Sequence, residues 1–199
     1  MPSPSTENLV ALLGSRICHD LSSPIGAVSN GLELLSLSGV PDSPEMSLVA
    51  DSAANARARI SLFRLAFGMA SPDQITRRDE ICDIWPAAMA GRRLDLNWHA
   101  PSSLPRQGAQ LVVLALLCLD KALPQGGALG VSEQNGVWSL CATAPVLRLD
   151  QLLWEALSTG QSDHVDPANV QFLLLPYYLE LQGKRCDVRI TQDSVTLAF

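Results

Sequence analysis

The residues best suited to covalent chemistry lie near the N-terminus, where His19 is followed directly by Asp20 in the stretch SRICHDLSSPIG. A neutral imidazole nitrogen is a nucleophile near pH 7, and the proton on the other ring nitrogen can be oriented by a neighbouring carboxylate. The pair is therefore suited to accepting a phosphoryl group. Within a helix, Pro24 would free the carbonyl of Asp20 and loosen the backbone beside the histidine.

On a helix the residues around His19 form a face of small polar side chains. At about 100° per residue this face carries Ser15, Ser22, Ser23, Gly26, Asn30 and Glu33, and Arg16 lies one turn before the histidine. Exposed helix faces usually carry long charged side chains, which have high helix propensity and form i,i+4 pairs. The small residues would let a partner reach the imidazole, so the sequence predicts a docking face with Arg16 beside the phosphoryl group. Ordinary solvated side chains at His19, Asp20 and Arg16 are the alternative.

Two long helical patterns position this face. Residues 6–38 and 44–70 are separated by SGVPDSP, whose glycine and prolines end one helix and open the next. They predict an αα-hairpin. Opposite His19 the first helix is apolar, at Leu9, Leu13, Ile17, Leu21, Val28, Leu32 and Leu35. Two hairpins can bury such stripes in a four-helix bundle, so we expect residues 1–72 to form a homodimer, unless the second half of the chain covers the stripe.

Residues 73–199 have a different character and form the second expected domain. A strand at 94–98 precedes a buried helix at 107–123 and a pair of strands around the turn Asn135-Gly136. Helical patterns at 150–158 and 167–182 follow, and two strands close the chain. The order predicts antiparallel strands with helices on one face. The expected fold class is therefore α+β, in two domains.

The overall composition excludes several classes of function. A net charge of −6 and a pI of about 4.9 argue against nucleic-acid binding. The longest apolar run, residues 111–119, is too short to span a bilayer, and the first ten residues do not resemble a secretory signal. The five cysteines have no metal-ligand spacing. We expect reduced thiols, no metal site, no membrane contact and a cytoplasmic location.

The stretch HDLSSPIGAVSNGLELL resembles the phosphoacceptor box of sensor histidine kinases, in which a histidine, an acid and a proline lie on the first helix of a dimeric hairpin. In those kinases an ATP-binding α/β-sandwich follows, and residues 73–199 resemble a degenerate version of it. Residues that would serve the nucleotide are replaced, at Cys118, Ala142, Ala144, Val146, Asn169 and Gln171. The replacements would remove a Mg²⁺ ligand, an acceptor for the adenine amino group and the close backbone approach to phosphates.

A kinase-like hairpin followed by a degenerate ATPase-like domain is similar to the dimeric histidine phosphotransferases of bacterial phosphorelays, of the ChpT type. The resemblance implies that His19 is the phospho-acceptor and that Asp20 orients or deprotonates it. It also implies that the chain shuttles phosphoryl groups, without ATP, from the receiver domain of an upstream hybrid histidine kinase to downstream response regulators. Ser15, Arg16, Ser22, Ser23, Gly26 and Asn30 would form the docking site. The chain would bind no cofactor, because Mg²⁺ would come with the receiver.

Two other functions agree with the same residues. An ATP-dependent sensor-type histidine kinase with an unusual nucleotide site would have the same first half. A non-catalytic dimeric adaptor would use the His19 face only to bind response regulators. Whether the chain counts as an enzyme, a phosphotransferase without kinase activity, depends on which of these holds.

Overall fold

The computed structural model describes residues 6–39, 43–159 and 165–199, which form two compact units. The first comprises Met1–Ser71 and Glu80–Ala90, and the second comprises Pro72–Asp79 and Gly91–Phe199. The sequence-based division at residue 72 had assigned residues 80–90 to the second domain. In the structure this short segment groups with the helical hairpin.

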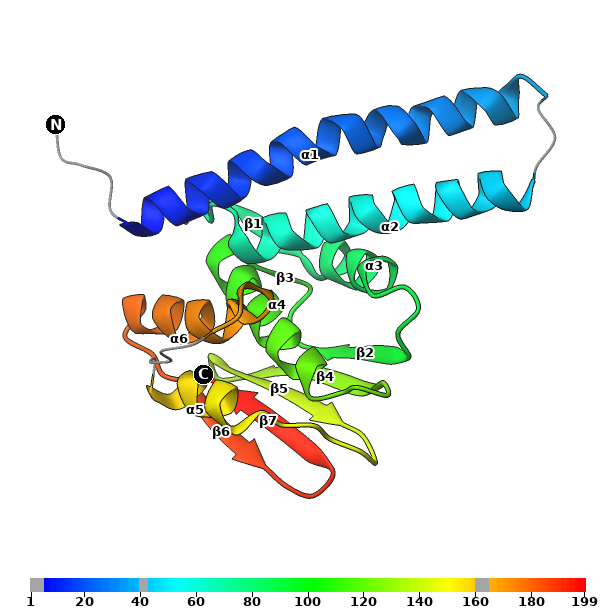
Figure 1. Ribbon diagram of the computed structural model, residues 1–199. Coiled ribbons are helices and arrows are strands. Elements are labelled where there is room, and N and C mark those ends of the chain that lie inside the picture. The colour runs from blue at the N-terminus through cyan, green and yellow to red at the C-terminus, as the bar shows by residue number, and fades with distance from the viewer. Residues whose placement is uncertain (1–5, 40–42, 160–164) are drawn as a thin grey trace, which may run out of the picture. The chain divides into compact units, whose positions relative to one another are not determined.

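The first unit contains the expected hairpin. Helix α1 (Thr6–Leu37) and helix α2 (Pro44–Phe67) lie side by side over most of their length (Figure 1). Gly39, at φ 78°, follows the end of α1, and the hydroxyl of Ser43 accepts a hydrogen bond from the backbone of Met46 to cap α2. The sequence analysis therefore placed both helices within three residues of their observed ends.

Helix α2 packs against one side of α1 and leaves another apolar side uncovered. Cys18 of α1 is buried, as are Ala53, Leu62, Leu65 and Ala66 of α2. The stripe opposite His19 is exposed: Leu13, Ile17, Leu21, Val28 and Leu35 keep 44 to 61% of their surface. A row of exposed aliphatic side chains on one helix is typical of an interface.

A third helix, α3 (Arg78–Ala88), was not predicted, and most of its residues belong to the first unit. Ile81, Trp85 and Ala88 are completely buried. The side-chain amide of Asn55 on α2 donates a hydrogen bond to the carbonyl oxygen of Ala87 at 2.9 Å. This short helix therefore adds apolar packing to the hairpin.

The second unit is a five-stranded sheet with the order β2-β4-β5-β7-β6. The strands are β2 (Leu94–His99), β4 (Gly127–Gln134), β5 (Val137–Thr143), β6 (Asp187–Ile190) and β7 (Ser194–Ala198). The expectation of a fully antiparallel sheet was wrong, because β2 and β4 are parallel. Helix α4 (Arg106–Lys121) lies between these two strands in the sequence and makes the long crossover that parallel strands require.

Helices α4, α5 (Gln151–Thr159) and α6 (Gln171–Leu181) belong to the same unit as the sheet (Figure 1). Helix α4 is buried along most of its length, and the inward residues of the central strands, Leu129, Val131, Leu140, Val195 and Leu197, are completely buried. The expected helix at 167–182 is divided into a 3₁₀ turn (Pro167–Asn169) and α6. The expected β-turn is confirmed by positive φ angles at Asn135 and Gly136.

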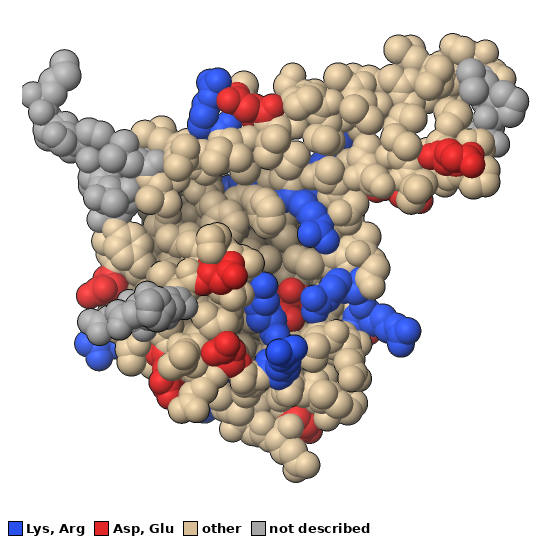
Figure 2. Space-filling model, viewed as in Figure 1, with Lys and Arg blue, Asp and Glu red and all other residues tan. Residues whose placement is uncertain are grey.

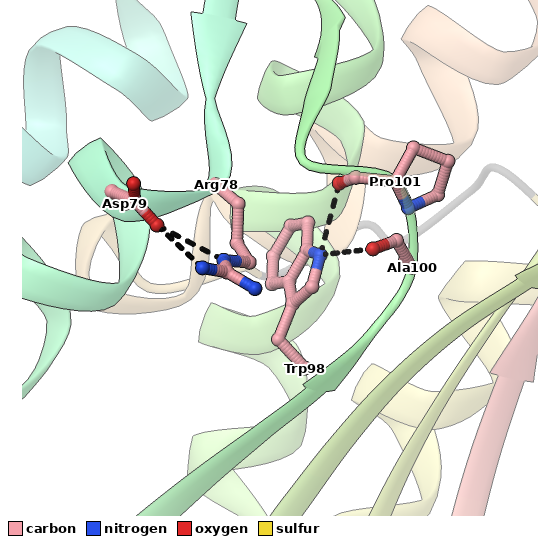
Figure 3. Close-up of polar contacts among 5 residues, drawn as sticks. All are labelled: Arg78, Asp79, Trp98, Ala100 and Pro101. Atoms are coloured by element: carbon pink, nitrogen blue, oxygen red, sulfur yellow. Dashed lines mark hydrogen bonds and ion pairs between the residues drawn. The ribbon is translucent and has the colours of Figure 1, made fainter.

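Two short strands, β1 (Ile75–Arg77) and β3 (Ser103–Pro105), pair antiparallel in a separate two-stranded sheet that contacts α4. The loop before β3 is held by the indole of Trp98, whose Nε1 donates to the carbonyl oxygens of Ala100 and Pro101 at 3.1 and 3.2 Å (Figure 3). All five cysteines are free thiols. In the described part of the chain, no helix is long and apolar enough to cross a membrane.

Candidate functional site

His19 lies in the middle of α1 with 80% of its side chain exposed. Its Nδ1 is 3.2 Å from Oδ1 of Asp20, the next residue. A carboxylate can only accept a hydrogen bond, so this contact favours the neutral tautomer with the proton on Nδ1. The lone pair is then on Nε2, the nucleophilic position, on a side chain open to solvent.

Asp20 also binds a cation. Its Oδ2 is 2.8 Å from Nε of Arg16, one helical turn earlier. The hydrogen bond with His19, and secondarily the nearby guanidinium of Arg16, lower the pKa of Asp20 below its usual value. The carboxylate is therefore ionised at neutral pH and can keep accepting from the imidazole. The structure thus brings three of the predicted site residues into one hydrogen-bonded group.

The remaining predicted residues are distributed along the same face of α1. Ser22, Ser23 and Asn30 are exposed and Gly26 is half-buried. The hydroxyl of Ser22 donates to the carbonyl oxygen of Cys18 at 2.7 Å, which keeps this side chain close to the helix backbone. A Cβ atom built on Gly26 would meet nothing within 4 Å. The packing of this chain therefore does not require a glycine there. Because Gly26 has no side chain, nothing protrudes from the helix at this position on the His19 face.

Charge is sparse along this helix. Most of the surface of α1 in Figure 2 is neither acidic nor basic, apart from one adjoining pair of opposite sign. Pro24 lies within α1 and has no amide hydrogen, so the carbonyl of Asp20 lacks its usual helical donor. His19 thus lies on a helix face of small, mostly uncharged side chains, close to the point where Pro24 interrupts the helical hydrogen bonds.

Ser15 differs from the other predicted docking residues. It is half-buried, and its Oγ accepts a hydrogen bond from the backbone N–H of Met69 at 3.0 Å. The sequence analysis did not find this contact. A backbone amide has no side-chain signature, so only the fold brings Met69 beside Ser15.

The positions where the resemblance expects nucleotide-binding residues lie in the second unit. Cys118 on α4 is completely buried, and burial raises the pKa of its thiol well above the usual value. Ala142 and Ala144 are buried as well. A pocket of about 660 Å³ in this unit is lined by Asp120 and Arg92, among other residues. The carboxylate of Asp120 is 2.9 Å from Nη2 of Arg92. No cluster of three or more potential metal ligands occurs among the described residues.

An exposed histidine–carboxylate pair on a helical hairpin, followed by a mixed α/β unit, agrees with the class of protein that the sequence led us to expect. The family model described as the histidine phosphotransferase C-terminal domain matches residues 78–194. The chain belongs to this family of histidine phosphotransferases.

Two relatives extend the match over nearly the whole chain. Protein phosphotransferase ChpT of Brucella abortus (strain 2308) is 33% identical over 195 residues, which cover 94% of this chain and 90% of the relative. A bacterial phosphotransferase solved at 1.7 Å superimposes with a TM-score of 0.69 and 27% identity, over 99% of this chain and 98% of the other. The predicted α+β fold class, with a helical hairpin followed by an α/β domain, and the predicted family are confirmed.

Proposed function

We propose that His19 carries the phosphoryl group of a phosphorelay, between a receiver domain of an upstream hybrid histidine kinase and downstream response regulators. The observation that carries the proposal is the geometry of the pair: Asp20 accepts from Nδ1, which leaves the exposed Nε2 free to attack. Arg16 holds the other carboxylate oxygen and keeps Asp20 ionised.

The transfer step is a displacement at phosphorus. Nε2 attacks the aspartyl phosphate of the receiver, the bond between phosphorus and the aspartate oxygen breaks, and the receiver recovers a free carboxylate. The ring becomes cationic while it keeps its Nδ1 proton, and the negative charge of Asp20 stabilises that cation. The reverse displacement, by a second receiver's aspartate, restores neutral His19. Catalysis is then mostly positioning and charge neutralisation, with Mg²⁺ supplied by the receiver.

The second unit supports the proposal that ATP is not used. A hard cation at a triphosphate needs oxygen ligands. Cys118 stands at the position where the kinases have such a ligand, and its neutral thiol faces the protein core. The chain is therefore proposed to bind no nucleotide and no metal of its own.

We further propose that the working form is a homodimer. The exposed stripe on α1, from Leu13 to Leu35, consists of apolar residues that recur at helical spacing. A second copy of the hairpin would cover it with an identical stripe and complete a four-helix bundle. His19 lies on the opposite side of α1 and stays accessible in that assembly.

The proposal is tested with a receiver domain carrying ³²P on its aspartate. Label should pass to the wild-type chain, be labile in acid and stable in alkali, and be absent from His19→Ala. His99→Ala, at another exposed histidine, is the matched control and should be labelled normally. Equal labelling of His19→Ala would overturn the proposal. Label taken directly from Mg-ATP would indicate a kinase, and receiver binding without any transfer would indicate an adaptor.

A further inference from the structure

The end of α2 is tied to α1 one turn before His19. The hydroxyl oxygen of Ser15 accepts the N–H of Met69 at 3.0 Å. The N–H of Gly68 donates to the carbonyl of Arg64 at 3.2 Å and closes the last turn of α2. The Ser15 contact therefore joins the first helix to the point where the second helix ends.

At this point the two helices approach through their backbones. A Cβ atom on Gly14 would lie 2.7 Å from the carbonyl oxygen of Phe67, closer than side chains are found. A Cβ atom on Gly68 would lie 3.3 Å from Oγ of Ser15 and 2.5 Å from the carbonyl oxygen of Arg64. A glycine at position 14 thus permits the close approach of the two helices, and a glycine at position 68 permits the turn that ends α2 beside Ser15. We call Gly14, Ser15, Gly68 and Met69 the clasp.

The clasp and Pro24 lie on either side of His19 along α1. Pro24 removes one hydrogen bond from the helix ladder, so α1 bends most easily on that side of the histidine. The imidazole itself is 80% exposed, so the path of the α1 backbone decides where Nε2 lies. A fixed point is therefore needed on the other side of His19, and the clasp is located there.

We propose that Ser15 is a positioning residue for phosphoryl transfer: by accepting the Met69 amide it fixes the His19 segment of α1 against α2. This inference rests on the proposed function of His19. Ser15 acts through the hairpin and makes no contact with the receiver, which differs from the docking role predicted from the sequence. The distinction is measurable, since a docking residue changes affinity whereas a positioning residue changes the rate within the complex.

The test measures single-turnover transfer from the labelled receiver over a range of receiver concentrations. Displacements near 1 Å cost up to about a hundredfold in rate, so a released clasp in Ser15→Ala should lower the maximal rate by about tenfold. The half-saturating receiver concentration should not change. Ser15→Thr keeps a hydroxyl and should restore most of the rate. Gly14→Ala, which leaves the hydroxyl but pushes the helices apart, should lower the maximal rate as well.

Two controls separate this inference from simpler explanations. Ser36→Ala changes an exposed serine of the same helix and should behave as the wild type. Phosphoramidate, a small phosphoryl donor that does not dock, should label His19 equally fast in the wild type and in Ser15→Ala. A raised half-saturating concentration with an unchanged maximal rate, or no change at all, would overturn the positioning role. A wild-type chain that takes no label from the receiver would instead overturn the proposed function.

Discussion

Leu21→Ala should weaken the proposed homodimer by an amount that follows from the exposure of this side chain. Leu21 lies on the stripe opposite His19 and is 49% exposed. Full burial of a leucine contributes about 1.5–3 kcal/mol, so burying the remaining half contributes about 1 kcal/mol in each chain. In a symmetric dimer the substitution occurs twice, which gives a loss of about 2 kcal/mol. The dissociation constant should therefore rise by about thirtyfold.

The measurement is sedimentation equilibrium over a dilution series, with circular dichroism to show that the helices persist. Leu21→Asp should dissociate the dimer further, because an unpaired carboxylate would be buried at the interface. Leu152→Ala is the matched control: this leucine is 71% exposed, but it lies on α5 in the second unit. A monomeric wild type at micromolar concentration would refute the reasoning, as would equal losses at Leu21 and Leu152.

Three further predictions concern the site and the fold. The pKa of Asp20, read from the ¹³C shift of its carboxyl carbon, should rise towards the ordinary value in His19→Ala and also in Arg16→Ala, because the hydrogen bond with the imidazole and the nearby guanidinium both lower it. In the wild type, Asp20 loses its charge only as the pH falls through this lowered pKa. Its hydrogen bond with His19 should therefore persist to a lower pH than a carboxyl group with the ordinary pKa would allow. Gly126→Ala should lower the free energy of unfolding, measured in urea, by more than about 2 kcal/mol, because φ is 92° and the added Cβ would overlap a backbone carbonyl. Gly136→Ala is the matched control: φ is 82° but the added Cβ meets open space, so the loss should be only about 1 kcal/mol. Addition of millimolar Mg-ATP should leave the melting temperature unchanged, and an upward shift would contradict the proposed lack of nucleotide binding.

The local elements could be read from the sequence because their signals are local. Gly39 and Pro44 bracket the hairpin loop, and Asn135-Gly136 adopts the positive φ angles that a tight turn needs. Helix α3 was missed because it is short and contains Pro86, although its buried residues recur at helical spacing. The parallel pairing of β2 with β4 was missed although the predicted order of strand, helix and strand is the one that connects parallel neighbours.

The contacts of the candidate site likewise include some that follow from spacing in the sequence and one that does not. Arg16 and Asp20 are four residues apart on a helix, so their ion pair, like the contact between neighbouring His19 and Asp20, follows from spacing. The contact of Ser15 with Met69 joins residues 54 positions apart and uses a backbone donor. No property of either side chain points to the other, so this contact required the structure.

The openness of the site follows from what the partner is proposed to supply. A chain that binds ATP must enclose triphosphate, metal and adenine, and we propose that the second unit lacks the residues for that. A relay intermediate needs only a nucleophile and the carboxylate that orients it, because the receiver brings both the phosphoryl group and the metal. His19 can therefore lie on a bare helix face with 80% of its side chain exposed. With so few groups at the histidine, the rate depends on where the helix holds it, which makes the contacts between α1 and α2 part of the catalytic design.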